Sequence, residues 1–133
     1  MEIDLQHEYT ASLRVLSTNK SLAELIALLG DPSDGHEVGG PVSARLPGRT
    51  REGSRWDLKS TVGRARRLDE HIDELVTFVE KHRNTFARLQ ADCEIDIFCG
   101  VFTSDNVNGG FVLEPSLAGR LHELQLPVVV DVY

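Results

Sequence analysis

The chain has 133 residues, of which 41% are hydrophobic and 26% are charged, and its formal net charge is −7. This composition fits one globular domain and excludes a disordered chain, a collagen-like repeat and a low-complexity assembly. The acidic balance argues against broad nucleic-acid binding, because that function needs a basic surface that displaces counterions.

The cysteine count and the start of the chain favour a soluble, cytoplasmic protein. Cys93 and Cys99 are too few for a disulfide-rich secreted scaffold, and their spacing differs from the CxxC of redox and zinc sites. Residues 1–8 are acidic and lack the basic and apolar regions of a secretion signal. No later run approaches the roughly 20 apolar residues of a membrane span, so we expect no membrane association.

The first two elements follow from hydrophobic spacing. Residues 9–17 alternate between apolar and polar side chains, which predicts a half-buried strand. Ser21 and Glu24 form a capping-box pattern ahead of leucines at helical spacing, and Gly30 can supply a left-handed cap. This pattern predicts a short amphipathic helix between the caps.

The middle of the chain alternates between loop, strand and helix patterns. The glycine- and proline-rich stretch 31–53 is long for a plain connection, so we expect a short strand near 36–38. Residues 54–60 alternate again, with Trp56 facing inward. Apolar residues at helical spacing, preceded by acidic first turns, predict one long helix over 67–90.

The last third contains strands on both sides of a helix. Residues 93–102 read as a central strand, and 108–110 form an Asn-Gly-Gly turn that favours a hairpin into a strand at 111–113. Pro115 opens a third helix, and residues 127–133 form a final strand. The buried side of this helix is expected to consist of Leu117, Leu121 and Leu124.

The predicted order is strand, helix, strand, helix, strand, strand, helix, strand. No linker divides this series, so we expect a single domain over residues 1–133. The fold class is α+β, with a largely antiparallel sheet and helices packed on one face, loosely like a ferredoxin-type split.

Several of these stretches together resemble one family. They are, in chain order, Ser12-Leu13-Arg14-Val15, the helix ending Leu28-Leu29-Gly30, Trp56-x-Leu58, the long helix with its acidic start, and the strand 126–133. In this order they resemble the family known as domain of unknown function 4279 (DUF4279). The resemblance covers nearly the whole chain and implies a bacterial source and a compact α+β fold. It implies no activity and no catalytic residue.

The strongest anomaly is the charge of residues 45–67. This segment holds eight basic residues, seven of them arginine, against two acidic ones, a net charge of +6. The rest of the chain, with six basic and nineteen acidic residues, carries −13. Two interpretations stay open: the arginines form exposed ion pairs with the acidic helix that follows, or they bind an anion or an acidic partner.

The candidate ligand-binding residues come from this segment. Residues 48–54 superficially resemble a phosphate-binding P-loop, but the motif's lysine is missing and a strand follows where the motif needs a helix. Flexible backbone amides together with Arg49, Arg51 and Arg55, near Trp56, could still hold a phosphate or a carboxylate. The alternative for Trp56 is a place in the core.

The sequence indicates no metal site, no cofactor and no nucleophilic cysteine. The segment 34–37 and the pair His71 and Glu74 contain metal-ligating residue types without a diagnostic spacing, so we predict neither a metal nor a cofactor. Cys93 and Cys99 fall on the apolar side of a predicted strand, where burial raises the thiol pKa. We therefore assign no catalytic residue.

Three functions remain in competition. The first is a non-enzymatic, immunity-like module that recognises a protein partner, for which the acidic surplus outside 45–67 provides long-range attraction. The second is a protein or enzyme that binds a small anion or phosphate ligand through the 45–67 segment. The third is a homodimer formed through an edge strand such as 127–133. We expect Arg51→Ala and Arg55→Ala to leave folding intact.

Overall fold

The computed structural model describes residues 7–37, 41–43, 46–50, 53–103 and 111–133, and gives only the backbone of 41–43 and 46–50. In chain order the elements are β1 (Glu8–Ser17), α1 (Leu22–Leu29), β2 (Asp34–His36), β3 (Pro41–Ser43), β4 (Leu46–Thr50), β5 (Ser54–Lys59), α2 (Leu68–Lys81), α3 (Arg83–Leu89), β6 (Cys93–Phe102), α4 (Pro115–Glu123) and β7 (Val128–Val132).

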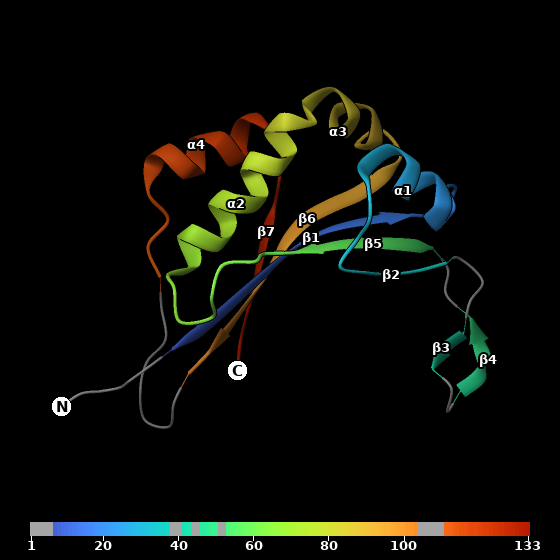
Figure 1. Ribbon diagram of the computed structural model, residues 1–133, viewed down its shortest axis with the longest axis horizontal. Helices are drawn as coiled ribbons and strands as arrows, with labels where there is room; N and C mark the ends of the chain where they lie inside the picture. Colours follow the sequence, from blue (N-terminus) through green and yellow to red (C-terminus); the bar gives the residue numbers. More distant parts are fainter. Residues whose placement is uncertain (1–6, 38–40, 44–45, 51–52, 104–110) are drawn as a thin grey trace.

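A five-stranded sheet in the order β2-β5-β1-β6-β7 forms one layer, and the helices lie together on one side of it (Figure 1). All neighbouring strands in this sheet are antiparallel except β6 and β7, which are parallel. The helix α4 supplies the crossover that a parallel pair needs. β3 and β4 form a separate two-stranded ribbon. The predicted α+β class, with a largely antiparallel sheet, is confirmed.

The core lies between the sheet and the helices. The alternation of β1 turns Leu13 and Val15 toward the helices, and the register places them opposite Ile97 and Ile95 of β6. The long helix contributes one apolar stripe to the same layer. Its buried members are Leu68, Ile72, Leu75, Val76 and Val79.

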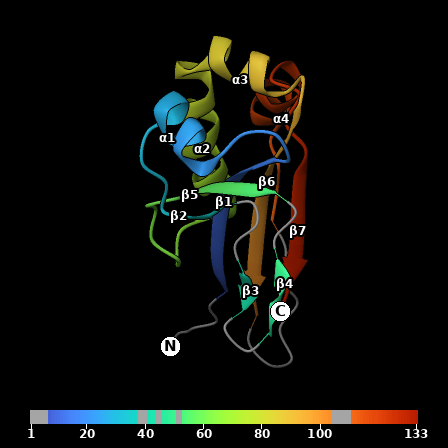
Figure 2. The same cartoon turned by 90° about the vertical axis from the view of Figure 1, so that its right-hand side faces the viewer.

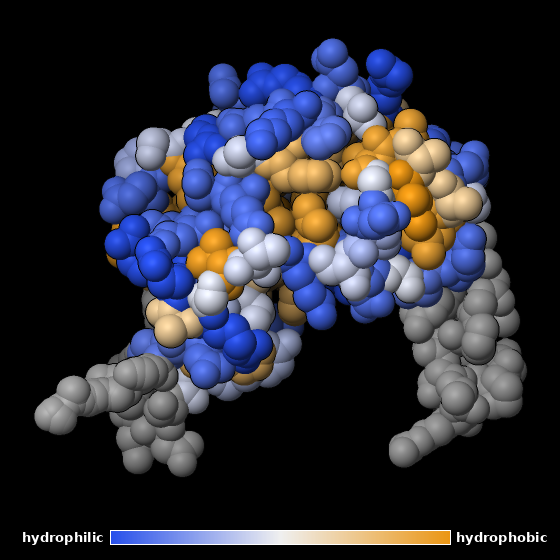
Figure 3. Space-filling model, in the orientation of Figure 1, coloured by the Kyte–Doolittle hydropathy of each residue, from blue (hydrophilic) through white to orange (hydrophobic). Residues whose placement is uncertain are grey.

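The helix α1 has the caps that the sequence predicts. The Ser21 hydroxyl accepts a hydrogen bond from the Glu24 amide at 3.1 Å, and the Glu24 carboxylate accepts one from the Ser21 amide at 2.8 Å. Gly30 ends the helix with φ of 94°, a backbone conformation that favours glycine. Figure 3 shows an apolar patch over α1 on the helix side of the molecule. Leu28 of this helix is exposed.

The prediction of one continuous helix over 67–90 is wrong. The helix breaks at His82, whose φ of −120° and ψ of 32° leave the helical region, and α3 begins at the next residue. The run 80–85 offers no apolar side chain that would hold a straight helix against the sheet. The break turns Phe86 and Leu89 into the core.

The predicted strand at 111–113 is also wrong. These residues form no strand in the structure, and all three side chains are exposed, while the predicted turn at 108–110 lies outside the described residues. A hairpin partner for β6 has no place to pair, because β1 and β7 already occupy both sides of β6. The chain therefore passes from β6 to α4 rather than back along the sheet.

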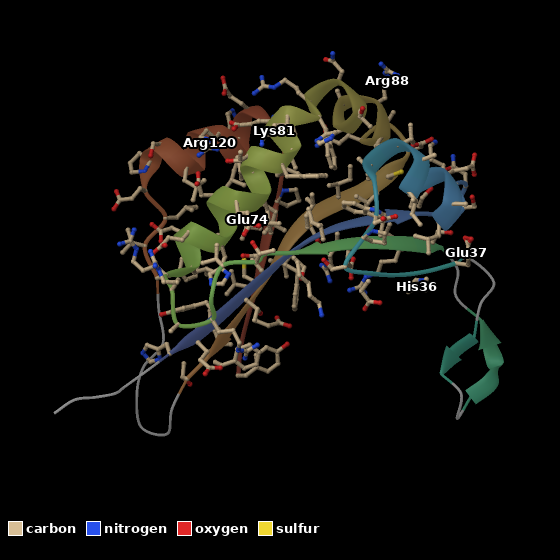
Figure 4. The ribbon with its side chains drawn as sticks, viewed as in Figure 1. His36, Glu37, Glu74, Lys81, Arg88 and Arg120 are labelled. Atoms are coloured by element: carbon tan, nitrogen blue, oxygen red, sulfur yellow. The ribbon has the colours of Figure 1, made fainter. Side chains whose placement is uncertain are left out.

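The helix α4 begins at Pro115 as predicted, and its three expected leucines are buried. Arg120 ties it to α2, as Figure 4 shows. Its guanidinium donates to both oxygens of Glu80 at 3.0 and 2.9 Å, to the Thr77 hydroxyl at 3.2 Å and to Asp73. These carboxylates raise the pKa of Arg120, so the tether keeps its charge at any ordinary pH.

Candidate functional site

The sheet has one surface that the helices leave uncovered, which we call the open face. Successive residues of a strand point to opposite sides, so Arg14, Arg55, Asp57 and Asp96 lie on the open face when their neighbours enter the core. The strand register places Arg14 directly opposite Asp57 on one side and Asp96 on the other. An arginine therefore stands between two carboxylates at the middle of the sheet.

Arg14 is bound through two parallel hydrogen bonds. Its Nε donates to Asp96 Oδ1 at 2.7 Å and its Nη2 donates to Asp96 Oδ2 at 2.6 Å. The guanidinium also lies 4.5 Å from the centre of the Phe98 ring, within the range of a cation–π interaction. The hydrogen bonds to Asp96 raise the pKa of Arg14. This pair is rigid because both the fork and the ring fix its orientation.

Arg55 forms the second pair. Its Nε donates to Asp57 at 2.9 Å, and its Nη2 lies 2.8 Å from Asp57 Oδ2. The Asp57 side chain is only 7% exposed and that of Arg55 is 40% exposed. The arginine thus covers a buried carboxylate instead of pointing freely into solvent.

A depression of about 210 Å³ lies beside these two pairs. It is lined by Arg14, Leu16, His36, Arg55, Glu94 and Asp96, five of which are ionisable side chains from four different strands. His36 is the last residue of β2, and Glu37 follows it directly, as Figure 4 shows. The walls of the depression offer charges of both signs.

The other end of the open face carries aromatic and aliphatic side chains. Phe102 and Tyr133 stack with their ring centres 4.8 Å apart, and the Arg64 guanidinium lies 4.8 Å from the Phe102 ring centre. Val129 lies opposite Phe98 in the parallel register of β6 and β7. The open face therefore combines paired charges with exposed apolar groups.

Two of the predicted ligand residues, Arg55 and Trp56, lie on opposite faces of the sheet. Trp56 is fully buried on the helix side of β5, opposite to Arg55, and its indole N–H donates to the Gly30 carbonyl at 2.8 Å. Arg49 lies in β4, but its side chain is outside the described residues, and Arg51 lies outside them altogether. Of the two predicted residues whose side chains are described, Arg55 lines the depression and Trp56 does not.

The other described arginines of the 45–67 segment pair with carboxylates. Arg64 binds Glu8 at 2.9 Å, Arg66 binds Glu70 at 2.7 Å, and Arg67 binds Asp69 at 3.0 Å. The ion-pair interpretation is confirmed for Arg66 and Arg67, because both partners belong to the first turn of α2. This pairing weakens the case for an open arginine clamp.

Arg14, Leu16, His36, Glu94 and Asp96 were not among the predicted site residues. Except for His36, their positions on the polar side of predicted strands were visible in the sequence as alternation. The pairing of β1 with β5 and β6, and of β5 with β2, was not visible there, and these pairings bring the five residues together.

A sequence model of the family described as domain of unknown function (DUF4279) matches residues 7–133. The chain belongs to the DUF4279 family. No curated protein and no solved structure matches it.

Both thiols of this DUF4279 domain have a raised pKa, as predicted. Cys99 is buried in the core, and burial raises its pKa to about 12. Cys93 is half-buried at the start of β6, and burial raises its pKa as well. A raised pKa keeps a thiol protonated and lowers its nucleophilicity at neutral pH.

Within the described ranges, no three His, Cys, Asp or Glu side chains are grouped so that they could hold a metal ion. None of the helices described for this DUF4279 domain is both long and apolar enough to cross a membrane.

His71 and Glu74 meet at the hydroxyl of Ser60. The Ser60 hydroxyl lies 2.9 Å from His71 Nδ1 and 3.1 Å from the Glu74 carboxylate, which also accepts from the Thr61 amide at 2.9 Å. Ser60 follows β5 directly, so this cluster ties the end of β5 to α2. Because the acid contacts the serine instead of the histidine, the order of a catalytic triad is absent from these three residues.

We expect the DUF4279 domain to lose stability through His71 as the pH falls. Burial lowers the pKa of His71, and this effect outweighs the neighbouring Glu74 carboxylate and the carbonyls of Gly63 and Arg66. An unfolded chain binds the proton more readily, with a histidine pKa of about 6.5, so the contribution is complete above that pH and is lost below it. Urea unfolding of the wild type and of His71→Gln between pH ~7.5 and ~5.5 measures it.

The expected result is a steeper loss of unfolding free energy in the wild type than in His71→Gln. Equal slopes for the two proteins would show that another group titrates in this window. Glu74, whose pKa is lowered by its hydrogen bonds to Thr61 and Ser60, loses its contribution only at lower pH, below about 4.3.

Proposed function

We propose that this domain is a non-enzymatic interaction module that recognises a protein partner through the open face of its sheet. The observation that carries the proposal is the one-sided helix layer: it leaves a sheet surface on which ordered charge pairs adjoin exposed apolar side chains. Protein interfaces combine these features, with arginine and aromatic residues enriched at their centres.

The pairing of the arginines favours a protein over a small anion as the ligand. An anion that binds Arg14 or Arg55 has to displace the carboxylate of Asp96 or Asp57, each of which already occupies the guanidinium fork. A protein surface can add contacts around these pairs without breaking them. The neutral pairs then determine orientation and specificity more than raw affinity.

The charge of the chain supports the same choice. The surplus of −13 outside residues 45–67 attracts a basic partner over a distance and speeds its association. The effect depends on ionic strength, because exposed charges are screened over about 8 Å at physiological salt.

A matched pair of variants tests which surface binds. Leu16 lines the depression on the open face and is 37% exposed, whereas Leu28 lies on the helix α1 and is 44% exposed. Leu16→Arg and Leu28→Arg make the same chemical change on opposite sides of the domain. Wild-type and variant baits are compared by quantitative affinity capture, and a captured protein is then purified and titrated by calorimetry.

We expect a partner that the wild type and Leu28→Arg bind equally and that Leu16→Arg binds at least about tenfold more weakly, a loss of about 1.4 kcal/mol. A partner lost only with Leu28→Arg would move the binding surface to the helix side and contradict the proposal. A thermal-shift screen of phosphates and dicarboxylates is the second arm. A dose-dependent rise in Tm that Arg55→Ala abolishes would favour the anion-binding alternative.

Arg55→Ala should cost stability, contrary to the expectation from the sequence that it leaves folding intact. Its removal leaves the Asp57 carboxylate, 7% exposed, without its arginine. We now expect a loss of about 1–3 kcal/mol in the free energy of unfolding, because a buried polar group loses its partner. The double variant Arg55→Ala/Asp57→Ala should recover part of this loss. Urea unfolding measures both, and wild-type stability in Arg55→Ala would show that water solvates Asp57.

A further inference from the structure

The two edges of the five-stranded sheet differ in how well they are protected. At one edge, β2 has only three residues and begins with the exposed carboxylate of Asp34. At the other edge, β7 has five residues, four of which are valine, and Asp131 is its single charged residue. Short strands, charges and prolines are the usual protection against edge pairing, and β7 has neither a lysine nor a proline. Figure 2 shows β7 at this edge of the sheet, beside β6.

The outer side of β7 offers a regular row of backbone groups. In the parallel ladder with β6, the Pro127 carbonyl accepts from the Ile97 amide at 2.9 Å, and the Tyr133 amide donates to the Val101 carbonyl at 2.8 Å. The odd-numbered residues of β7 therefore face β6. Because strand backbone groups alternate in direction, the amides and carbonyls of Val128, Val130 and Val132 point away from the sheet. No other described strand pairs with them.

We infer that β7 pairs in antiparallel register with β7 of a second copy of this chain, about a two-fold axis at Val130. In this register Val130 lies opposite itself, and Val128 lies opposite Val132 of the second copy. The outward amides and carbonyls then all meet in hydrogen-bonded pairs, and the two sheets join into one continuous sheet with both helix layers on the same side.

Several registers keep the helix-covered faces of the two sheets on the same side. The charge of Asp131 and the length of β7 favour the one centred on Val130. A register centred on Asp131 would place two carboxylates directly opposite each other, which destabilises a strand pair. A register centred on Val129 would leave Val132 opposite residue 126, which precedes the strand. With Val130 at the centre, Asp131 lies opposite Val129 of the second copy, and all five residues of β7 take part.

The side chains at this edge suit such a contact. Val132 is 64% exposed and Val129 is 38% exposed, although both are aliphatic. Pairing the two strands places Val132 beside Val128 of the second copy on one face and Val129 beside Asp131 on the other, and it satisfies the open backbone groups. The contact is small, so the dimer is reversible and depends on concentration.

The first test removes one backbone donor. Val132→Pro deletes an amide that points outward, a place where an edge strand tolerates proline, and Val132→Thr keeps the amide and the β-branched shape. Sedimentation velocity of the purified chain, from low micromolar to near-millimolar concentration, measures association. We expect the wild type and Val132→Thr to shift from monomer to dimer mass, and Val132→Pro to stay monomeric with a far-ultraviolet circular dichroism spectrum like that of the wild type.

The second test examines the register and does not depend on proline. Val129→Lys places an ammonium opposite Asp131 of the second copy, whereas Val129→Asp places a carboxylate there. We expect the dimer dissociation constant to rise at least about tenfold in Val129→Asp relative to Val129→Lys, and Val129→Asp/Asp131→Lys to restore association.

A wild-type chain that remains monomeric over the whole concentration range overturns the inference. So does a dimer that all of these variants form equally well, because it must use another surface. The experiments contain only the purified chain, so their outcome does not depend on whether the open face recognises another protein.

Discussion

Replacing Trp56 with alanine should lower the free energy of unfolding by about 3–5 kcal/mol, one of the two largest effects we expect from a single substitution. The indole is fully buried on β5, stacks on Phe78 with ring centres 6.0 Å apart, and donates to the Gly30 carbonyl at the end of α1. Its removal leaves a cavity and an unpaired carbonyl where α1, α2 and the sheet meet. Urea unfolding followed by circular dichroism measures the loss.

Two further variants separate packing from hydrogen bonding at this position. Trp56→Phe keeps an aromatic ring and loses the donor to Gly30, so its cost should lie between those of the wild type and Trp56→Ala. Lys59→Ala changes an exposed residue of the same strand and should stay within about 0.5 kcal/mol of the wild type. Wild-type stability in Trp56→Ala would place the ring outside the core and reopen its candidacy as a ligand-binding residue.

Phe86→Ala should cost a similar amount, about 3–5 kcal/mol, although α3 has only seven residues. Phe86 is buried and meets Phe78 edge-to-face, with ring centres 6.1 Å apart and an interplanar angle of 78°. Since an isolated helix of this length has little stability of its own, burial of Phe86 and Leu89 holds α3 against the domain. The break at His82 is stable for the same reason.

Arg88→Ala is the matched control on α3, because Arg88 is exposed on the same helix, as Figure 4 shows. It should change the free energy of unfolding by less than about 0.5 kcal/mol. Trp56 and Phe86 both touch Phe78, so the double variant Trp56→Ala/Phe86→Ala should lose less than the sum of the single losses. Equal losses from Phe86→Ala and Arg88→Ala would mean that α3 is not packed as described.

Local patterns were enough to predict most of the elements. The alternation of residues 9–17 predicted β1, and the capping box of Ser21 and Glu24 predicted the start of α1, because both signals act between near neighbours in the chain. Pro115 predicted the start of α4 for the same reason. The break at His82 was missed, because the apolar spacing on its two sides still fits one helix and only packing against the sheet favours the turn.

For the candidate site, closeness in the sequence did not predict closeness in space. Arg49, Arg51, Arg55 and Trp56 were grouped because they are close in sequence, yet the alternation of β5 sends Arg55 and Trp56 to opposite sides of the sheet. The alternation was itself visible in the sequence. The ion-pair partner of Arg55 was less apparent. It is Asp57, two residues further along β5 and on the same face of the sheet.

By itself, the sequence determined the composition class, the α+β character, the inward position of Trp56 and the resemblance to the DUF4279 family. These depend on periodicity and turn chemistry over short distances. Only the tertiary structure decided the strand order β2-β5-β1-β6-β7, the charge row formed by Asp57, Arg14 and Asp96, and the edge position of β7. Strand pairing joins residues that are distant in the chain, such as Arg14 and Asp96, which are 82 positions apart, and no local pattern specifies which strands become neighbours.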